Sequence, residues 1–411
     1  MEDNLDLGIT FDLPKNKSNV IKAIGVGGGG SNAINYMFNQ GIKGVDFVIC
    51  NTDAQALNNS GVPNKIQLGV NLTEGLGAGA NPEVGSQSAI ESTEDIKAML
   101  NVNTKMVFIT AGMGGGTGSG AAPAIAKIAK ELGTLTVGIV TKPFAFEGPK
   151  RHKRALAGIE EMKKNCDTLL AIPNETLLEI TDENTTVTES FKLADSVLHQ
   201  ATKGISDLIN IPGLINLDFA DVKTVMENMG DAIMGTGIAH GEERAILAAQ
   251  QAINSPLLQD ASITGSQGLL VNITGPENMT IHELNDASSI IYEEAGADAN
   301  VILGCVLDKN LTDEVRVTVI ATGLNGDGKR EYNSIPHSAK PEFTLPQVDN
   351  NMNEEDNGIS AFQESSTSVN EPESTPTLFK EDGSDGETTA EPVITFGDDL
   401  DVPAFIRNRQ E

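Results

Sequence analysis

The chain has 411 residues, 39% of them hydrophobic, which is enough for two or three domains with at least one sizeable core. Its formal net charge of −30 argues against nucleic acid and anionic membrane surfaces as direct partners, because both bind through Lys and Arg side chains. The start is acidic and not typical of a secretory signal, and the three widely spaced cysteines suggest no disulfide framework. No apolar run approaches the ~20 residues needed to span a membrane. These features predict a cytoplasmic protein.

The first ~180 residues alternate between strand and helix signals. Short buried strands are predicted at residues 20–26, 45–50, 106–111, 134–140 and 167–172. Helices are predicted between them, at residues 31–39, 82–100, 120–132 and 150–164. This alternation implies an α/β fold with a Rossmann-like parallel sheet that is covered by helices on both faces.

A long central helix is predicted over residues 186–211. Thr186 and Glu189 have capping-box spacing, and apolar residues then repeat at helical spacing up to the Pro212-Gly213 break. Such a helix is over 30 Å long at ~1.5 Å per residue, so we expect it to join two domains. Phe191 falls on the apolar stripe, and periodicity alone favours a core position for it.

Residues 223–335 are predicted to form a second, smaller α+β domain. Its helices are expected at residues 242–253 and 281–294, and its strands at residues 268–273, 300–306 and 315–321.

The composition changes after this domain. Residues 341–411 contain 17 Asp and Glu residues and only three Lys and Arg residues, a net charge of −14. Residues 336–398 are predicted to be a disordered acidic linker, because their few apolar residues cannot offset the entropy of ordering. Residues 399–411 place an apolar cluster before Arg407 and Arg409, which is typical of a docking peptide; a frayed terminus is the alternative.

Two glycine clusters each follow a predicted strand and open a predicted helix. The first spans residues 25–32 (GVGGGGSN), and the second, residues 112–120, contains six glycines in nine positions. Glycines let a backbone approach a phosphate closely, and free N–H groups at a helix start bind the anion. Gly25, Gly27 and Gly30 also fit the G-x-G-x-x-G dinucleotide fingerprint. A tight strand–helix turn without a ligand is the lesser alternative for the first cluster, and it explains the six glycines of the second cluster poorly.

Six segments occur in order along the chain: GVGGGGSNA (25–33), NTDAQAL (51–57), GLGAGANPEVG (75–85), GGGTGSG (114–120), PFAFEGPKR (143–151) and INLDFADVKTVM (215–226). Together they resemble the tubulin superfamily and, within it, the FtsZ family of tubulin-like cell-division GTPases. Ser119 stands where Thr is usual, and Pro149 interrupts a stretch that is often basic. The resemblance implies a flexible extension (1–18), a GTP-binding domain (19–185), the connecting helix (186–211) and a catalytic loop (212–222).

The resemblance also implies a site for GTP or GDP, with Mg²⁺ held mainly through phosphates and water. The expected phosphate-binding residues are Gly28, Gly29, Gly30, Ser31, Asn32, Gly115, Gly116, Thr117, Gly118 and Ser119. Those expected near the γ-phosphate are Asn51, Asp53, Ala78, Gly79 and Ala80. Glu147 and Arg151 are expected at the ribose, although their spacing alone fits a solvated pair. Phe191 is expected to stack on the base, and Asp195 to accept the paired N–H donors that guanine presents and adenine lacks.

In the resembling family, the loop carrying Asn216, Asp218 and Asp221 enters the nucleotide site of the neighbouring subunit and positions the attacking water. Considered alone, Asp218 and Asp221 fit helix-capping positions better than a catalytic role. The implied contact is heterologous, so it propagates as a head-to-tail filament, the basis of the division ring.

The resemblance extends to the docking peptide, through Asp401, Val402, Pro403, Ala404, Phe405, Ile406 and Arg407. It implies docking to an actin-like membrane tether and other division proteins at mid-cell. A ~60-residue linker spans roughly 40–45 Å, and many weak peptides on one filament give avidity.

Three other functions stay open from the residues. A Rossmann-type dehydrogenase fits G-x-G-x-x-G but leaves the second glycine cluster unexplained. A nucleotide-binding scaffold that polymerises without hydrolysis has no use for Asp218 and Asp221. A monomeric GTPase switch predicts hydrolysis that is independent of protein concentration.

Overall fold

The computed structural model describes residues 21–100, 103–179, 181–182, 184–211, 213–215, 217–258, 263–296 and 299–324. These residues all belong to one compact unit, Met1–His337. The predicted extension (1–18), acidic linker (336–398) and docking peptide (399–411) lie outside the described residues and stay predictions.

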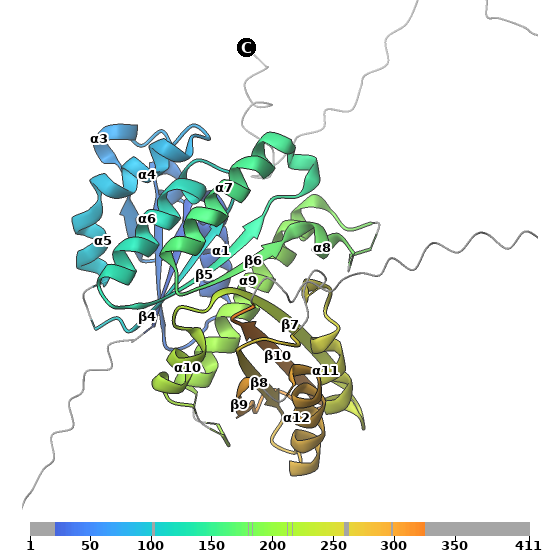
Figure 1. The fold of residues 1–411 in the computed structure, drawn as a ribbon. Coiled ribbons are helices and arrows are strands. Elements are labelled where there is room, and N and C mark those ends of the chain that lie inside the picture. The colour runs from blue at the N-terminus through green and yellow to red at the C-terminus, as the bar shows by residue number, and fades with distance from the viewer. Residues whose placement is uncertain are drawn as a thin grey trace, which may run out of the picture. The chain divides into compact units, whose positions relative to one another are not determined.

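The first half of this unit contains the predicted parallel sheet, in the order β3-β2-β1-β4-β5-β6 (Figure 1). Its strands are β1 (Ile21–Val26), β2 (Val45–Asn51), β3 (Asn64–Gln67), β4 (Met106–Gly112), β5 (Leu135–Lys142) and β6 (Thr168–Pro173). In the register, Ile21 lies opposite both Val45 and Met106. The sequence missed β3 because this four-residue edge strand is partly exposed and lacks a run of apolar residues.

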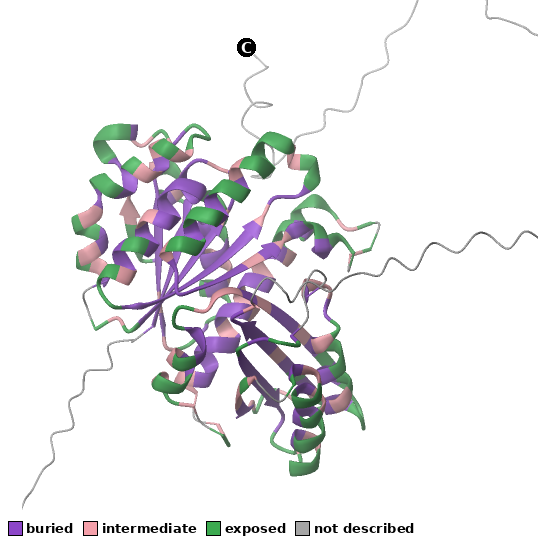
Figure 2. Ribbon diagram, viewed as in Figure 1, coloured by how far each residue is buried: buried purple, intermediate pink, exposed green. Residues whose placement is uncertain are grey.

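Helices cover both faces of the parallel sheet, whose strands form the buried layer in Figure 2. They are α1 (Gly27–Asn39), α2 (Ala54–Asn58), α3 (Val70–Thr73), α4 (Pro82–Glu91), α5 (Thr93–Leu100), α6 (Thr117–Glu131), η1 (Ala145–Glu147), α7 (Pro149–Asn165) and α8 (Asn174–Leu178). On one face α1 packs with the central helix, and on the other α4 to α7 pack together.

The single helix predicted over residues 82–100 is wrong, because the chain breaks at Ser92 between α4 and α5. The Ser92 hydroxyl accepts a hydrogen bond from the Gly69 backbone N–H at 3.1 Å, and the residue leaves the helical conformation. A side chain that bonds distant backbone competes with helix continuation, and the sequence pattern does not reveal such a partner.

The central helix, α9, runs from Val187 to Asn210. It begins with the predicted capping box, in which the Thr186 side chain accepts from the Glu189 N–H and Glu189 accepts from the Thr186 N–H. Its buried face includes Val197, Leu198 and Ile205, each contributing about 1.5–3 kcal/mol by leaving water. The same hydrophobic cluster takes in residues from both halves of the sheet, so α9 packs across both.

The second half continues the same sheet rather than starting a separate one. Its elements are α10 (Phe219–Met226), β7 (Gly230–His240), α11 (Arg244–Ile253), η2 (Pro256–Leu258), β8 (Gly268–Gly275), α12 (Ile281–Ala295), β9 (Asn300–Leu307) and β10 (Glu314–Thr322). Strand β7 pairs in parallel with β6 from Thr168–Gly230 onward, which gives ten strands in the order β3-β2-β1-β4-β5-β6-β7-β10-β8-β9. The sequence missed β7 because its glycines and small residues weaken the strand signal.

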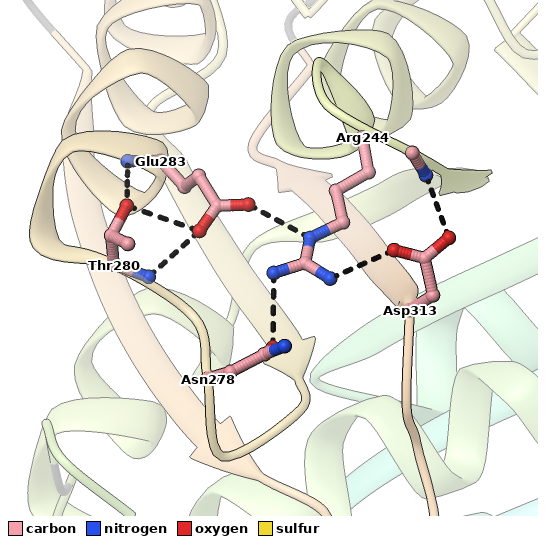
Figure 3. A network of polar contacts seen from close by, with 6 residues as sticks. Arg244, Asn278, Thr280, Glu283 and Asp313 are labelled. Atoms are coloured by element: carbon pink, nitrogen blue, oxygen red, sulfur yellow. Dashed lines mark hydrogen bonds and ion pairs between the residues drawn. The ribbon is translucent and has the colours of Figure 1, made fainter.

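A buried arginine ties the second half together (Figure 3). Arg244 begins α11, and only 7% of its side chain is exposed. Its Nε lies 2.8 Å from Glu283 on α12, Nη1 lies 3.2 Å from Asp313 before β10, and Nη2 lies 3.1 Å from Asn278. Burial alone would raise the pKa of Glu283, but hydrogen bonds from Arg244 and Thr280 outweigh it and hold the pKa below its ordinary value.

We predict that Arg244→Met lowers the free energy of unfolding by about 3 kcal/mol, because it removes the charged partner of Glu283, a carboxylate whose side chain is only 18% exposed. Urea titration followed by circular dichroism measures this. The control is Lys309→Met, which breaks an exposed pair with Glu277 and should cost less than ~1 kcal/mol. The pKa of Glu283 is lowered in the folded protein, so the ionised carboxylate contributes to the free energy of unfolding above the ordinary pKa of a glutamate. This contribution is lost as the pH falls through the lowered pKa. Equal losses in the two variants would contradict this role.

Candidate nucleotide-binding and catalytic site

The two glycine loops meet at the carboxyl ends of the neighbouring strands β1 and β4. A Cβ atom added at Gly27 would lie 2.8 Å from the Gly118 nitrogen, and one at Gly29 would lie 3.1 Å from the Gly112 Cα. Gly27 also has a φ of +71°, which favours glycine. The loops therefore pack backbone against backbone, and larger side chains would force them apart.

Other glycines of this region face open space. A Cβ added at Gly28, Gly79 or Gly115 would have no heavy-atom neighbour within 4 Å. These open positions lie beside the first turns of α1 and α6, whose backbone N–H groups lack partners within their own helices. The arrangement is suited to binding a chain of phosphates.

Hydroxyl groups form hydrogen bonds within and beside the second glycine loop. Thr117 Oγ1 lies 2.8 Å from Thr52 Oγ1, and Ser119 Oγ accepts from the Gly114 N–H at 2.7 Å. Both hydroxyls are buried, so Ser119 stabilises the loop conformation, and its predicted contact with the nucleotide stays a prediction. Ser31 is also buried, and its Oγ has no hydrogen-bond partner among the described residues.

The residues predicted near the γ-phosphate lie against this loop. A Cβ at Gly116 would meet the Ala78 Cβ at 2.9 Å, which places the 78–80 segment beside the second glycine loop. Ala80 has a φ of +59°, unusual for a residue with a side chain, and its carbonyl accepts from Arg154 at 2.8 Å. Asp53 Oδ1 caps α2, accepting from the Gln55 N–H at 2.8 Å.

A small cavity of about 110 Å³ lies on the other side of the loops. Six predicted residues line it: Gly29, Asn32, Glu147, Arg151, Phe191 and Asp195. Glu147 pairs with Arg151 Nε at 2.9 Å and also accepts from the Phe144 N–H at 3.0 Å. The cavity is too small for a whole nucleotide, whose phosphates would lie on the open glycine loops.

Phe191 is not a core residue, so the position that periodicity alone favours is wrong. The side chain is 42% exposed and meets the Phe144 ring edge-on, with 5.3 Å between ring centroids. It lies near the start of α9 and lines the cavity, where a flat ring is available for stacking.

Sequence reasoning missed Asn174, which also lines the cavity. It is 4% exposed, and its Oδ1 has no hydrogen-bond partner among the described residues. A buried acceptor without a partner is costly unless a ligand supplies the donor. The available signal was its position directly after β6, because ligands of parallel sheets bind beyond the carboxyl ends of strands.

Burial raises the pKa of Asp195 to about 7. Between its ordinary value and pH 7 the folded state binds more protons than the unfolded state, so this group lowers stability as the pH rises through that window. Two N–H donors from a bound base would favour the carboxylate and lower this pKa again.

The acidic loop lies at the other end of α9 from this cavity. From Asp195 to Asn210 the helix rises about 22 Å at ~1.5 Å per residue. Asp218 and Asp221 follow it, exposed, and form a capping box: the Asp221 N–H donates to Asp218 at 2.9 Å and the Asp218 N–H to Asp221 at 3.1 Å. In Figure 1, α10 lies at the opposite end of the unit from α3 and α4. Asn216 lies outside the described residues.

The fold and the site together define a tubulin-like GTPase. Two glycine loops meet on a parallel sheet, a small cavity lies at the start of a long central helix, and the second half continues the sheet with antiparallel and parallel strands. The Tubulin/FtsZ family GTPase domain matches residues 20–182, and the FtsZ family C-terminal domain matches residues 230–325. The chain belongs to the FtsZ family, as the resemblance predicted.

Solved structures agree with this assignment. An FtsZ dimer from M. jannaschii is 46% identical, with a TM-score of 0.71 over 74% of this chain and 88% of that chain. CetZ1 from Haloferax volcanii, bound to GDP, is 19% identical, with a TM-score of 0.65 over 74% and 94%. CetZ2 of the same organism, a GTPγS-bound protofilament, is 19% identical, with a TM-score of 0.62 over 73% and 92%. The two CetZ structures support the fold alone. The predicted GTP- and GDP-binding activity follows from the family.

We predict that GTP affinity falls up to about tenfold per pH unit below pH 7, because neutral Asp195 cannot accept both guanine donors. Fluorescence titration with a labelled GTP analogue from pH 5.5 to 8 measures this. Asp195→Asn should bind GTP more weakly and lose most of the pH dependence. An unchanged pH profile in Asp195→Asn would assign the titration to another group.

Proposed function

We propose that this protein is a GTP-dependent cytoskeletal GTPase that assembles head to tail into filaments of the division ring. In this proposal the acidic loop of each subunit completes the nucleotide site of the next. One observation carries the proposal: exposed Asp218 and Asp221 lie beyond the far end of α9 from the glycine loops. They are too far away to reach the phosphates of their own chain.

The chemistry needs little more than placement. When water attacks the γ-phosphate of GTP, its oxygen bonds to phosphorus, the bond to the GDP oxygen breaks, and a proton leaves the water. Asp218 and Asp221, with Asn216, would hold and polarise that water in line with the leaving group. Their present use as a cap is compatible with this role, because each carboxylate has a second oxygen and further lone pairs.

Exposed apolar side chains at both ends of the unit support self-association. Leu76 and Phe146 are 86% and 65% exposed beside the glycine loops. Leu214 and Ile281, at the end of the unit that carries the acidic loop, are 66% and 74% exposed. Unlike surfaces on the two ends of one subunit make a heterologous contact, which repeats as a filament. The FtsZ relative described as a dimer points the same way.

Magnesium is the expected partner of the phosphates. Among the described residues no three His, Cys, Asp or Glu side chains are grouped closely enough to hold a metal alone. Mg²⁺ commonly binds through phosphates, waters and one or two protein oxygens, and Asn51 and Asp53 beside the loops fit that pattern. The ion would offset the charge on the phosphate oxygens.

The docking peptide, residues 399–411, would connect the filament to an actin-like membrane tether and other division proteins at mid-cell. Its apolar and basic composition supports this role. Within the described part of the chain, no helix has the length and apolarity needed to cross a bilayer. We propose recruitment through partner proteins that bind the docking peptide.

The alternatives explain less. A dehydrogenase has no use for a second open glycine loop facing the first. A non-hydrolysing scaffold accounts for Asp218 and Asp221 only as the cap of α10 and gives no role to their charges.

We predict that Asp221→Ala binds GTP normally but hydrolyses it at least about tenfold more slowly, with filaments that persist. The change also removes a cap, so Asp221→Asn, which keeps an acceptor there, separates charge from capping. Phosphate release and light scattering on the same samples measure both effects.

A mixing experiment tests the shared site directly. Gly28→Glu should fill the open phosphate position and abolish GTP binding while leaving the acidic loop intact. Mixed with Asp221→Ala, it should restore part of the turnover, because its loop completes the intact pockets of the other variant. If the mixture is no more active than its parts, or Asp221→Ala turns over normally, the shared site is wrong for Asp221.

We also predict that deleting residues 400–411 leaves GTP-dependent assembly unchanged and abolishes recruitment to the membrane in cells. Fluorescence microscopy of the tagged full chain and the deletion measures this. A deletion of equal length inside residues 341–398 is the control. Mid-cell recruitment that survives loss of the peptide would refute the docking role.

A further inference from the structure

A short cationic segment interrupts an otherwise acidic chain. Residues 150–154 (KRHKR) hold four of the 28 Lys and Arg residues, in a protein with a net charge of −30. They form the start of α7, and Lys150, Arg151, His152 and Lys153 are all exposed. We define Lys150, His152 and Lys153 as the head cluster, because Arg151 and Arg154 already bind Glu147 and the Ala80 carbonyl.

The head cluster is placed against the local preference of its helix. The first turn of α7 has no acidic residue, although the N-terminus of a helix attracts anions and repels cations. Neither lysine forms an ion pair with any described residue. Local rules of this kind are most often broken at functional sites.

The position of the cluster indicates which surface it serves. Arg151, within the same turn, lines the nucleotide cavity, and Gly114 packs against it. The head cluster therefore lies on the rim of the end of the subunit that carries the nucleotide site. In Figure 1, α7 begins at the end away from α10 and α12.

The opposite end is acidic. The Leu214 N–H donates to the Cys305 carbonyl at 2.9 Å, which joins the catalytic loop to the end of β9. The turn after β9 is joined to the end of β8, because the Asp308 N–H donates to the Gly275 carbonyl. Helix α12 begins at Ile281, six residues after Gly275. This end exposes Asp218 and Asp221. Glu277, which forms an exposed ion pair with Lys309 at 3.5 Å, lies before α12, and Asp286 is exposed on α12. We define Glu277 and Asp286, together with the two loop carboxylates, as the tail acids.

We propose that the head cluster binds the tail acids of the next subunit, so that opposite charges on the two ends orient assembly of this acidic protein. This inference rests on the proposed head-to-tail filament and names the charges that hold it. Two copies of a chain carrying −30 repel each other, unless cations on one face the carboxylates of the other. Assembly should then be fast, and its charge-dependent part should weaken strongly with added salt. The apolar contacts between subunits should depend little on salt.

The test uses the full chain with GTP and Mg²⁺. Lys150→Gln with Lys153→Gln should raise the critical concentration for light scattering about five- to tenfold at ~50 mM salt and less than about twofold at ~500 mM. GTP affinity below the critical concentration should stay within about twofold. The control removes the same charge from two exposed lysines elsewhere, Lys127 and Lys164, the second of which pairs with Glu161. Lys127→Gln with Lys164→Gln should leave the critical concentration near that of the wild type.

A charge exchange identifies the partner. Lys150→Glu with Lys153→Glu should block assembly at low salt, and adding Glu277→Lys with Asp286→Lys should restore part of it. The proposal is overturned if the critical concentration of the Gln variant matches the control, or if its GTP affinity falls enough to explain the change. Failure of the wild type to assemble with GTP would instead refute the proposed filament itself.

Discussion

The length and packing of α9 determine how the site can work. Its first turns carry Phe191 and Asp195 at the base-side cavity, and its last turn leads into the acidic loop. Its buried face packs against both halves of the sheet, which fixes the helix in place. With the proposed roles, a helix of this length places the nucleotide and the loop carboxylates at opposite ends of the subunit. A second copy of the chain is then the simplest way to bring them together.

The glycine loops impose the second constraint. Gly27 against Gly118 and Gly29 against Gly112 leave no room for side chains, so the two strand–helix turns share one surface of backbone. That surface presents N–H groups where Gly28 and Gly115 are open. In our proposal the backbone of the two loops binds the phosphates, and Asp195 and Asn174, which line the cavity alongside, select guanine.

Much of this could be predicted from the sequence, because it depends on local patterns. The alternating strands, both glycine loops and the Thr186–Glu189 cap are encoded within short windows. The misses depend on tertiary contacts. Ser92 ends α4 through a bond to distant Gly69, Phe191 lies at the cavity despite its helical spacing, and Asn174 gains meaning only from its unpaired Oδ1. Strand β7, with three glycines, is specified by its neighbours rather than by its own residues.

The most direct test of the account is GTP hydrolysis per subunit measured against protein concentration with Mg²⁺, together with light scattering on the same samples. The account predicts turnover near zero below a threshold and a rise per subunit as scattering appears, because the site is completed between subunits. Turnover per subunit that is constant from the lowest concentration upward would show a complete site in one chain and contradict the roles given to Asp218 and Asp221.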